Sequence, residues 1–265
     1  MGFIVVDGCN PNGDPSNGNL PRITYDGHGE ISSVSIKRKI RDTLYFMGCD
    51  IFVCSELSSD GCSTQKERAD KIEARSPGEF RDLACKKWID TRLFGQVLPI
   101  PKKLRKDAYA DTVSIGIRGP VTISQAVSID PVISELQWIT RAEGLLPPEG
   151  GKLKSPTTFG RKNFIRKSAY VFTGGVSPQL ASLTGASDDD IIDFRDALLK
   201  MYEYTPSSSR PDGTIFLHRL LWWEMEGNSS PAKIIQSVRI EPSEQWPYYK
   251  VAVEKINNAK MEEFV

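Results

Sequence analysis

The pattern of hydrophobic residues at the start of the chain predicts a buried strand followed by a helix. Residues 3–6 (Phe-Ile-Val-Val) form a short apolar run that is typical of a core strand. Residues 8–21 are rich in Asn, Gly and Pro and predict a loop. Ser32 or Ser33 can cap the helix and Gly48 can end it. Its apolar residues recur at helical spacing and share one face: Ile36, Ile40, Leu44 and Met47.

Two further helices have clear start signals. Residues 76–79 (Ser-Pro-Gly-Glu) form a capping box with proline at the first helical position. Ser187 caps the other helix, whose acidic first turn (residues 188–190) suits the helix dipole. The apolar stripes that follow comprise Phe80, Leu83, Ala84 and Trp88 in the first helix, and Ile191, Phe194, Leu198 and Met201 in the second.

Several other segments read as strands. Residues 113–127 alternate between apolar and polar positions, and Gly119-Pro120 within them predicts a bulge or an edge position. Further strands are predicted at residues 136–141, 168–173, 215–225, 234–240 and 248–253. Because several strands follow one another without a helical crossover, the sequence predicts an α+β fold with an antiparallel sheet.

Two segments have no apolar periodicity. Residues 61–75 are polar and predict an inserted loop or helix, and residues 142–164 predict a protruding loop or β-ribbon. There is no internal repeat and no low-complexity linker, so we expect one domain with insertions over residues 1–265.

Charge is balanced overall but segregated along the chain. With 34 basic and 34 acidic residues the net charge is zero, which by itself argues against a nucleic-acid binder. The acids gather at residues 188–190 and 262–263, however, so a neutral protein of this kind can still have one positive groove. The basic residues form three groups: Lys37, Arg38, Lys39 and Arg41; Lys102, Lys103, Arg105 and Lys106; and Lys152, Lys154, Arg161, Lys162, Arg166 and Lys167.

Composition and motifs exclude several classes of protein. No apolar run approaches the roughly 20 residues that cross a bilayer, and we expect a cytoplasmic protein without a membrane partner. The five cysteines contain no Cys-x-x-Cys pair, and only two histidines are present. No nucleophile–base set or phosphate loop emerges. We therefore expect no cofactor, no metal and no catalytic residues.

Three segments could contact nucleic acid. Residues 10–22 combine glycines, which allow close approach to a phosphate chain, with Asn side chains that can bond phosphate, sugar or base edges. Arg118 lies on the polar side of its strand. In residues 152–167 the cations alternate with Phe159 and Phe164, as in segments that bind a single strand by charge and ring stacking. The competing interpretations are a cluster of surface turns, a solvent-side ion pair and a solubilising loop.

Taken together and in order, these motifs resemble the backbone subunit of type I CRISPR Cascade, subtype I-C or I-B. The resemblance is carried by residues 10–15 (Asn-Pro-Asn-Gly-Asp-Pro), 18–22 (Gly-Asn-Leu-Pro-Arg) and 34–41 (Val-Ser-Ile-Lys-Arg-Lys-Ile-Arg). Later landmarks are residues 90–95, 118–121, 128–131 and 160–162, and the match runs from about residue 4 to about residue 240. The family often has Asp where Ser16 and Ser33 stand, which leaves the capping detail open.

The resemblance implies a palm of modified RNA-recognition-motif (ferredoxin-like) fold, with a finger-like insertion at about 50–110 and a thumb at about 140–167. It implies a non-catalytic subunit whose copies stack along the spacer of the guide RNA (crRNA) in a helical filament. Target DNA then pairs with the guide, and further Cascade partners are a guide-handle-binding subunit and a large subunit. From charge and position, we expect RNA contacts from Asn12, Arg22, Lys37, Arg38, Arg41 and Arg118 in the palm and from Phe159, Arg161, Lys162 and Arg166 in the thumb.

Two alternatives stay open at this point. One is a type III-like backbone subunit that cleaves target RNA with a metal held by Asp14 or Asp111. The other is a self-assembling scaffold without direct RNA contact. The RNA-binding interpretation requires the predicted cations, Lys37, Arg41, Arg118 and Arg161 above all, to converge on one surface.

Overall fold

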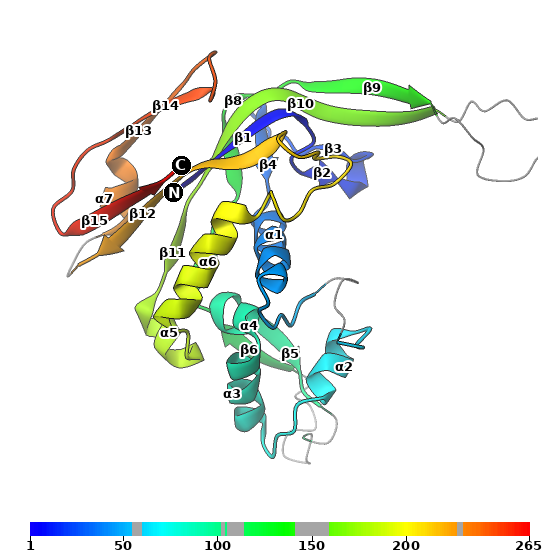
Figure 1. Cartoon of the computed structure of the whole chain (residues 1–265), viewed down its shortest axis with the longest axis vertical. Coiled ribbons are helices and arrows are strands. Elements are labelled where there is room, and N and C mark those ends of the chain that lie inside the picture. The colour runs from blue at the N-terminus through cyan, green and yellow to red at the C-terminus, as the bar shows by residue number, and fades with distance from the viewer. Residues whose placement is uncertain (55–59, 102–103, 105–113, 141–158, 227–229) are drawn as a thin grey trace, which may run out of the picture.

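A seven-stranded antiparallel sheet forms the centre of the molecule (Figure 1). The computed structural model describes residues 1–54, 60–101, 104, 114–140, 159–226 and 230–265. The strand order is β15-β12-β1-β10-β8-β4, and β9 pairs with the free part of β10. The strands are β1 (Gly2–Cys9), β4 (His28–Ile31), β8 (Ala126–Pro131), β9 (Ser134–Thr140), β10 (Phe159–Phe172), β12 (Ile215–Met225) and β15 (Ala259–Phe264). The predicted α+β class with an antiparallel sheet is confirmed.

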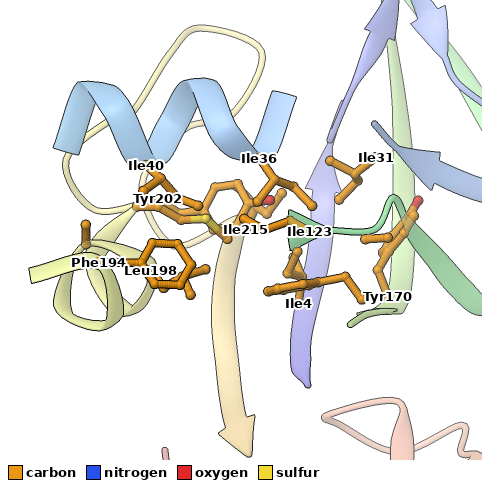
Figure 2. Packing of buried hydrophobic residues seen from close by; sticks show 14 of the residues in the cluster. Ile4, Ile31, Ile36, Ile40, Ile123, Tyr170, Phe194, Leu198, Tyr202 and Ile215 are labelled. Carbon is orange, nitrogen blue, oxygen red and sulfur yellow. The ribbon is translucent and has the colours of Figure 1, made fainter. Parts of the chain in front are cut away.

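Two helices cover one face of this sheet, α1 (Ser33–Phe46) and α6 (Asp188–Lys200). α1 follows β1 and precedes β8 in the chain, while α6 lies between β10 and β12. Figure 2 shows Ile36 and Ile40 of α1, with Phe194 and Leu198 of α6, in the core that also holds Ile4 of β1. Ser32 caps α1, and Ser187 with Asp190 forms a full capping box on α6. Both helices therefore begin as the sequence predicts.

The opposite face of the sheet is covered by the C-terminal part of the chain. The hairpin β13 (Val238–Pro242) and β14 (Tyr249–Val253) packs there, and Tyr249 stacks on Phe3 with ring centroids 4.7 Å apart. The strand predicted at residues 234–240 is wrong in its first half, which forms helix α7 (Pro231–Gln236). Pro231 at the first helical position favours the helix, and Ile234 is buried on its inner side.

A second hydrophobic cluster belongs to the inserted region that follows α1. It is built from α2 (Gln65–Asp70), α3 (Pro77–Lys87), α4 (Ile89–Phe94), β5 (Gly95–Pro99) and β6 (Ser114–Arg118), around buried Phe52, Phe80, Trp88 and Leu98. The predicted capping box of α3 is only half formed. Ser76 accepts from the Glu79 N–H, but the Glu79 carboxylate accepts from Arg75 N at 2.7 Å.

The continuous strand predicted at residues 113–127 is instead three short strands in three sheets. β6 pairs with β5, β7 (Val121–Ile123) pairs with β11 (Gly174–Val176), and β8 pairs with β10 and β4. The first break is at Gly119, which lies so close to Gly95 that a Cβ there would be 2.3 Å from the Gly95 nitrogen. The apolar alternation persists because each short strand buries a face of its own.

Beyond the sheet, β9 and β10 continue as a two-stranded ribbon that projects from the molecule (Figure 1). Its pairing runs from Ser134 opposite Ile165 to Thr140 opposite Phe159. The predicted ribbon is confirmed at its base, and the predicted strand at 168–173 is the other end of β10. The rest of the predicted thumb, residues 141–158, lies outside the described residues, as does the Phe159 side chain. Among the described helices, none is long and apolar enough to span a membrane.

Candidate nucleic-acid interface

The Asn- and Gly-rich segment after β1 is a compact, self-bonded hairpin. It contains β2 (Gly13–Asp14), a 3-10 turn (Pro15–Asn17) and β3 (Leu20–Pro21). Asn10 Nδ2 donates to Asn19 O at 2.8 Å, and Asn12 Oδ1 accepts from Ser32 N at 2.8 Å. The second bond joins the hairpin to the start of α1. The Asn12 Nδ2 group is the donor that this side chain can offer to a phosphate.

Arg22 and Asp14 face each other across this hairpin, with Arg22 Nη2 3.3 Å from Asp14 Oδ1. Hydrogen bonds from Ser16, followed by the nearby Arg22, hold the pKa of Asp14 below its ordinary value. The carboxylate is therefore ionised at neutral pH and already paired. No group of three or more His, Cys, Asp or Glu residues able to hold a metal occurs in the described part of the chain, and Asp111 lies outside it.

Helix periodicity divides the first basic group among three directions. Lys37 and Arg41 lie over the Phe94 ring of α4, at 5.6 Å and 4.9 Å from its centroid. Arg38 bonds Asp42 one turn further along α1, at 2.9 Å. Successive residues on a helix are about 100° apart, so Lys39 points elsewhere, toward α6. Its Nζ donates to Thr205 Oγ1 at 2.8 Å.

Arg41 has a structural partner that the sequence does not reveal. Its Nε lies 3.1 Å from Oδ2 of Asp90, a side chain that is 1% exposed. The same carboxylate accepts from the backbone N–H groups of Phe52 at 2.7 Å and Val53 at 3.1 Å. Arg41 therefore holds the inserted region onto α1, in addition to any contact that it makes with RNA.

Arg118 joins Lys37 and Arg41 near Phe94. It is the last residue of β6 and is paired with Gly95, the residue that follows Phe94. Its side chain is exposed, and within the described ranges it forms no ion pair. Lys37 and Arg41 thus lie over one aromatic ring, and Arg118 is paired through its backbone with the residue next to it; we call these three cations the Phe94 group.

The predicted β10 cations differ in their surroundings. A Cβ on Gly18 would be 3.9 Å from Arg161 Nη2, so the Arg161 guanidinium lies against the hairpin after β1. Arg166 forms two bonds to Glu135 of β9, at 2.6 and 2.7 Å. Lys162 has no described carboxylate partner. Arg161 thus belongs to a second group beside the hairpin, and the convergence of Lys37, Arg41, Arg118 and Arg161 on one surface stays a prediction.

Comparison with known proteins places this arrangement in a family. The model of the family described as "CRISPR-associated protein Cas7" matches residues 1–261. The chain belongs to the Cas7 family. A curated Cas7 protein of Haloferax volcanii is 26% identical over 198 residues, which cover 69% of this chain and 57% of that protein. The chain thus spans little more than half the length of this relative.

A solved structure shares the fold of this Cas7 chain. A chain of a "CRISPR RNA-guided surveillance complex, pre-nicking" superposes with a TM-score of 0.54 and 14% identity, covering 86% of this chain and 78% of the other. A second chain, from a "CRISPR RNA-guided surveillance complex", has a TM-score of 0.49 and 15% identity. The resemblance to a Cascade backbone subunit is confirmed at the family level, and the subtype stays a prediction.

In this Cas7 chain the motif at residues 90–95 is structural. Asp90 forms an ion pair with Arg41. Arg92 donates two hydrogen bonds to the Asp190 carboxylate of α6, at 2.8 and 2.6 Å. Gly95 has φ +73° and faces the Ile117 carbonyl, where a Cβ would clash at 2.3 Å. The motif connects α1, α6 and β6, which accounts for its composition without any contact to a ligand.

Two cations near the hairpin were not among the predicted contacts. Lys39 is buried beneath the segment that joins α6 to β12, and Arg210 of that segment donates from Nη1 to Asn10 O at 3.3 Å. Residues 206–213 are mostly Ser, Pro and Asp, so nothing in the local sequence distinguishes Arg210 from an ordinary loop cation.

Proposed function

We propose that this Cas7 chain is a non-catalytic backbone subunit of a type I CRISPR interference (Cascade) complex. Copies of it would assemble along the spacer part of the guide RNA and leave its bases free to pair with target DNA. The observation that carries this proposal is the placement of Lys37 and Arg41 over Phe94, with the exposed Arg118 paired to the neighbouring Gly95, in a chain of the Cas7 family. Cations of this kind bind phosphates without reading bases, and guide pairing then supplies the sequence specificity.

The strand order supports a palm of RNA-recognition-motif type. The elements β1-α1-β8-β10-α6-β12 lie in the spatial order β12-β1-β10-β8, which is the split βαβ arrangement of ferredoxin-like folds. Ordinary motifs of this type stack bases on the open face of the sheet. Here that face is covered by β13 and β14, with Phe3 stacked on Tyr249. RNA is therefore directed to the cations of α1, β6 and β10 instead.

The β9–β10 ribbon has the properties expected of the thumb at about 140–167. Arg161 and Lys162 lie on β10, while β9 exposes Trp138 (64%) and Leu136 (50%). Exposed aromatic and aliphatic side chains beside cations suit contacts with bases and with a neighbouring copy of the chain. The region around Phe52, Phe80 and Trp88 has its own hydrophobic cluster, which suits a finger-like insertion at about 50–110.

The test of this proposal is to reverse charge in the Phe94 group. The double variant Lys37→Glu, Arg118→Glu should lose most guide RNA from the purified complex. The matched control is Lys233→Glu, Lys250→Glu, which changes two exposed cations of the C-terminal part by the same charge. Arg41 is left unchanged, because a glutamate there would face the buried Asp90 carboxylate. Wild-type RNA content in a folded Phe94-group variant would overturn the proposal.

The same preparation distinguishes the two alternatives. Regularly spaced cuts in matched RNA with magnesium, lost in Asp14→Ala, would indicate a type III-like nuclease. Assembled protein that carries no RNA would indicate a scaffold. Guide retention that falls steeply with salt and is independent of spacer sequence is the result expected here.

A further inference from the structure

A second cluster of positive charge lies at the end of β1, on segments far apart in the sequence. The end of β1 is fastened to the α6–β12 segment: Asn10 N donates to Ser209 O at 3.0 Å, and Cys9 Sγ donates to Thr214 O at 3.4 Å. Figure 1 shows this segment beside β2 and β3. Arg210 lies in this segment, Lys39 of α1 donates to its Thr205 at 2.8 Å, and Lys162 lies on β10 three residues before Ile165, the partner of Cys9 in the sheet.

The charges of all three cations act on Cys9, at the end of β1. Burial raises the pKa of the Cys9 thiol, while its bond to Thr214 and the charges of Arg210, Lys162 and Lys39 act in the opposite direction. Burial, followed by the charge of Arg210, lowers the pKa of Lys39 to about 8. Three cations that act on one sulfur atom also repel one another, so this arrangement has an electrostatic cost.

No carboxylate among the described residues forms an ion pair with these three cations. The acid that acts on Lys39 is Asp42, which already bonds Arg38 through both oxygens. None of the described ion pairs includes Lys39, Lys162 or Arg210. Positive charge that is partly buried and unpaired is expected where the partner is an anion from outside the chain.

Buried polar atoms without a protein partner gather around the same arginine. They are Arg210 Nε itself, Ser207 Oγ, Tyr202 OH and Asn10 Oδ1. Ser207 exchanges two backbone bonds with Arg210, and Asn10 accepts from its guanidinium. Two of these atoms belong to side chains that are almost fully buried, Asn10 at 3% and Tyr202 at 5% exposure. The Arg210 Nε and the two hydroxyl groups are donors of the kind that bind phosphate oxygens, whereas Asn10 Oδ1 can only accept.

We propose that Arg210, together with Lys162 and the underlying Lys39, binds one phosphodiester group of the guide RNA. This rests on the proposed function and adds a binding site from the C-terminal half of the chain. The half-exposed Arg210 and Lys162 contact the phosphate directly, whereas the buried Lys39 adds charge from below. The hairpin after β1 closes the site, because Asn10 links it to Arg210.

The experiment compares Arg210→Gln and Arg210→Lys with the control Arg239→Gln, an exposed arginine (76%) of β13. RNA affinity of the purified chain is measured against salt with a single-stranded RNA of spacer length. Arg210→Gln should weaken binding about 10-fold and reduce the slope of log K against log[salt] by about 0.7, the value for one phosphate contact on a single strand. Arg210→Lys should keep most of the slope, and the control should match the wild type.

The melting temperature of the RNA-free protein distinguishes a phosphate site from a structural role of Arg210. If Arg210 binds phosphate, Arg210→Gln should leave this melting temperature unchanged or raise it, because the variant removes one of three mutually repelling cations. A lower melting temperature in both Arg210 variants, with equal loss of RNA binding, would overturn the phosphate site. So would an unchanged salt slope in Arg210→Gln. If the Phe94-group variant still loses RNA in that case, the proposed function stands and only this site is wrong.

Discussion

Asp90 offers the most quantitative test of how α1 is held against the inserted region. Asp90→Asn removes the charge that pairs with Arg41, while the side chain keeps its size. The carboxylate is 1% exposed and accepts from Arg41 Nε and from two backbone N–H groups. Oδ1 accepts from the Phe52 N–H, and Oδ2 accepts from the Val53 N–H and from Arg41, so the NH2 group of an asparagine must face a donor at one of the two positions. In either orientation Arg41 loses the negative charge that pairs with it.

The expected loss is a large part of the total stability. Removing one partner of a buried ion pair costs about 3–5 kcal/mol. One backbone bond is retained, so we expect about 3 kcal/mol, against roughly 5–15 kcal/mol for a whole protein. Arg41→Gln should cost a similar amount, and the double variant should cost clearly less than the sum of the two, because the charges depend on each other.

The measurement is urea unfolding of the RNA-free chain at pH 7, read by fluorescence and circular dichroism. The control is Asp42→Asn, which breaks the surface pair with Arg38 on α1 and should cost about 0.5 kcal/mol or less. An Asp90→Asn loss below about 1 kcal/mol, or additive losses for Asp90 and Arg41, would refute the reasoning. Arg41 would then be free to act mainly as a phosphate ligand.

Three further predictions concern Lys39, Gly95 and Glu135. The pKa of Lys39 is about 8 in the folded chain and 10.5 in the unfolded chain, so the unfolded chain binds more protons between these values and stability rises with pH there. Between pH 8 and 10.5 the free energy of unfolding of the wild type should rise by roughly 3 kcal/mol relative to that of Lys39→Met. A difference in unfolding free energy that stays constant over this pH range would contradict the prediction. Gly95→Ala should lower the free energy of unfolding by more than about 1 kcal/mol, because φ is +73° and its Cβ would clash with the Ile117 carbonyl. Gly48→Ala should lower it by less, because Gly48 also has a positive φ, of +93°, but its Cβ would lie in open space. Glu135→Gln should leave the melting temperature unchanged and tighten RNA binding by releasing Arg166, and weaker binding would show that the pair orders the ribbon.

The local sequence determined the elements whose signals lie within a few residues. The stripe of Ile36, Ile40 and Leu44 and the cap at Ser32 define α1, and Ser187 with Asp190 defines the start of α6. The apolar run in β1 and the break in periodicity before β10 gave a correct core strand and ribbon. Helix period, capping bonds and turn residues are properties of neighbouring positions, so they can be read without knowing the fold.

Only the tertiary structure decided which strands pair and which cations are free. The alternation at residues 113–127 is the same for one strand as for three, because a period of two does not specify the partner. Likewise, a charge pattern does not reveal its counter-charges. Arg41 meets Asp90 across 49 residues, and Arg210 meets Asn10 across 200. Folding thus pairs four predicted RNA contacts with carboxylates of the chain, namely Arg22, Arg38, Arg41 and Arg166. It leaves the unpredicted Arg210 without a carboxylate among the described residues, since Coulomb energies depend on distance in space and on burial.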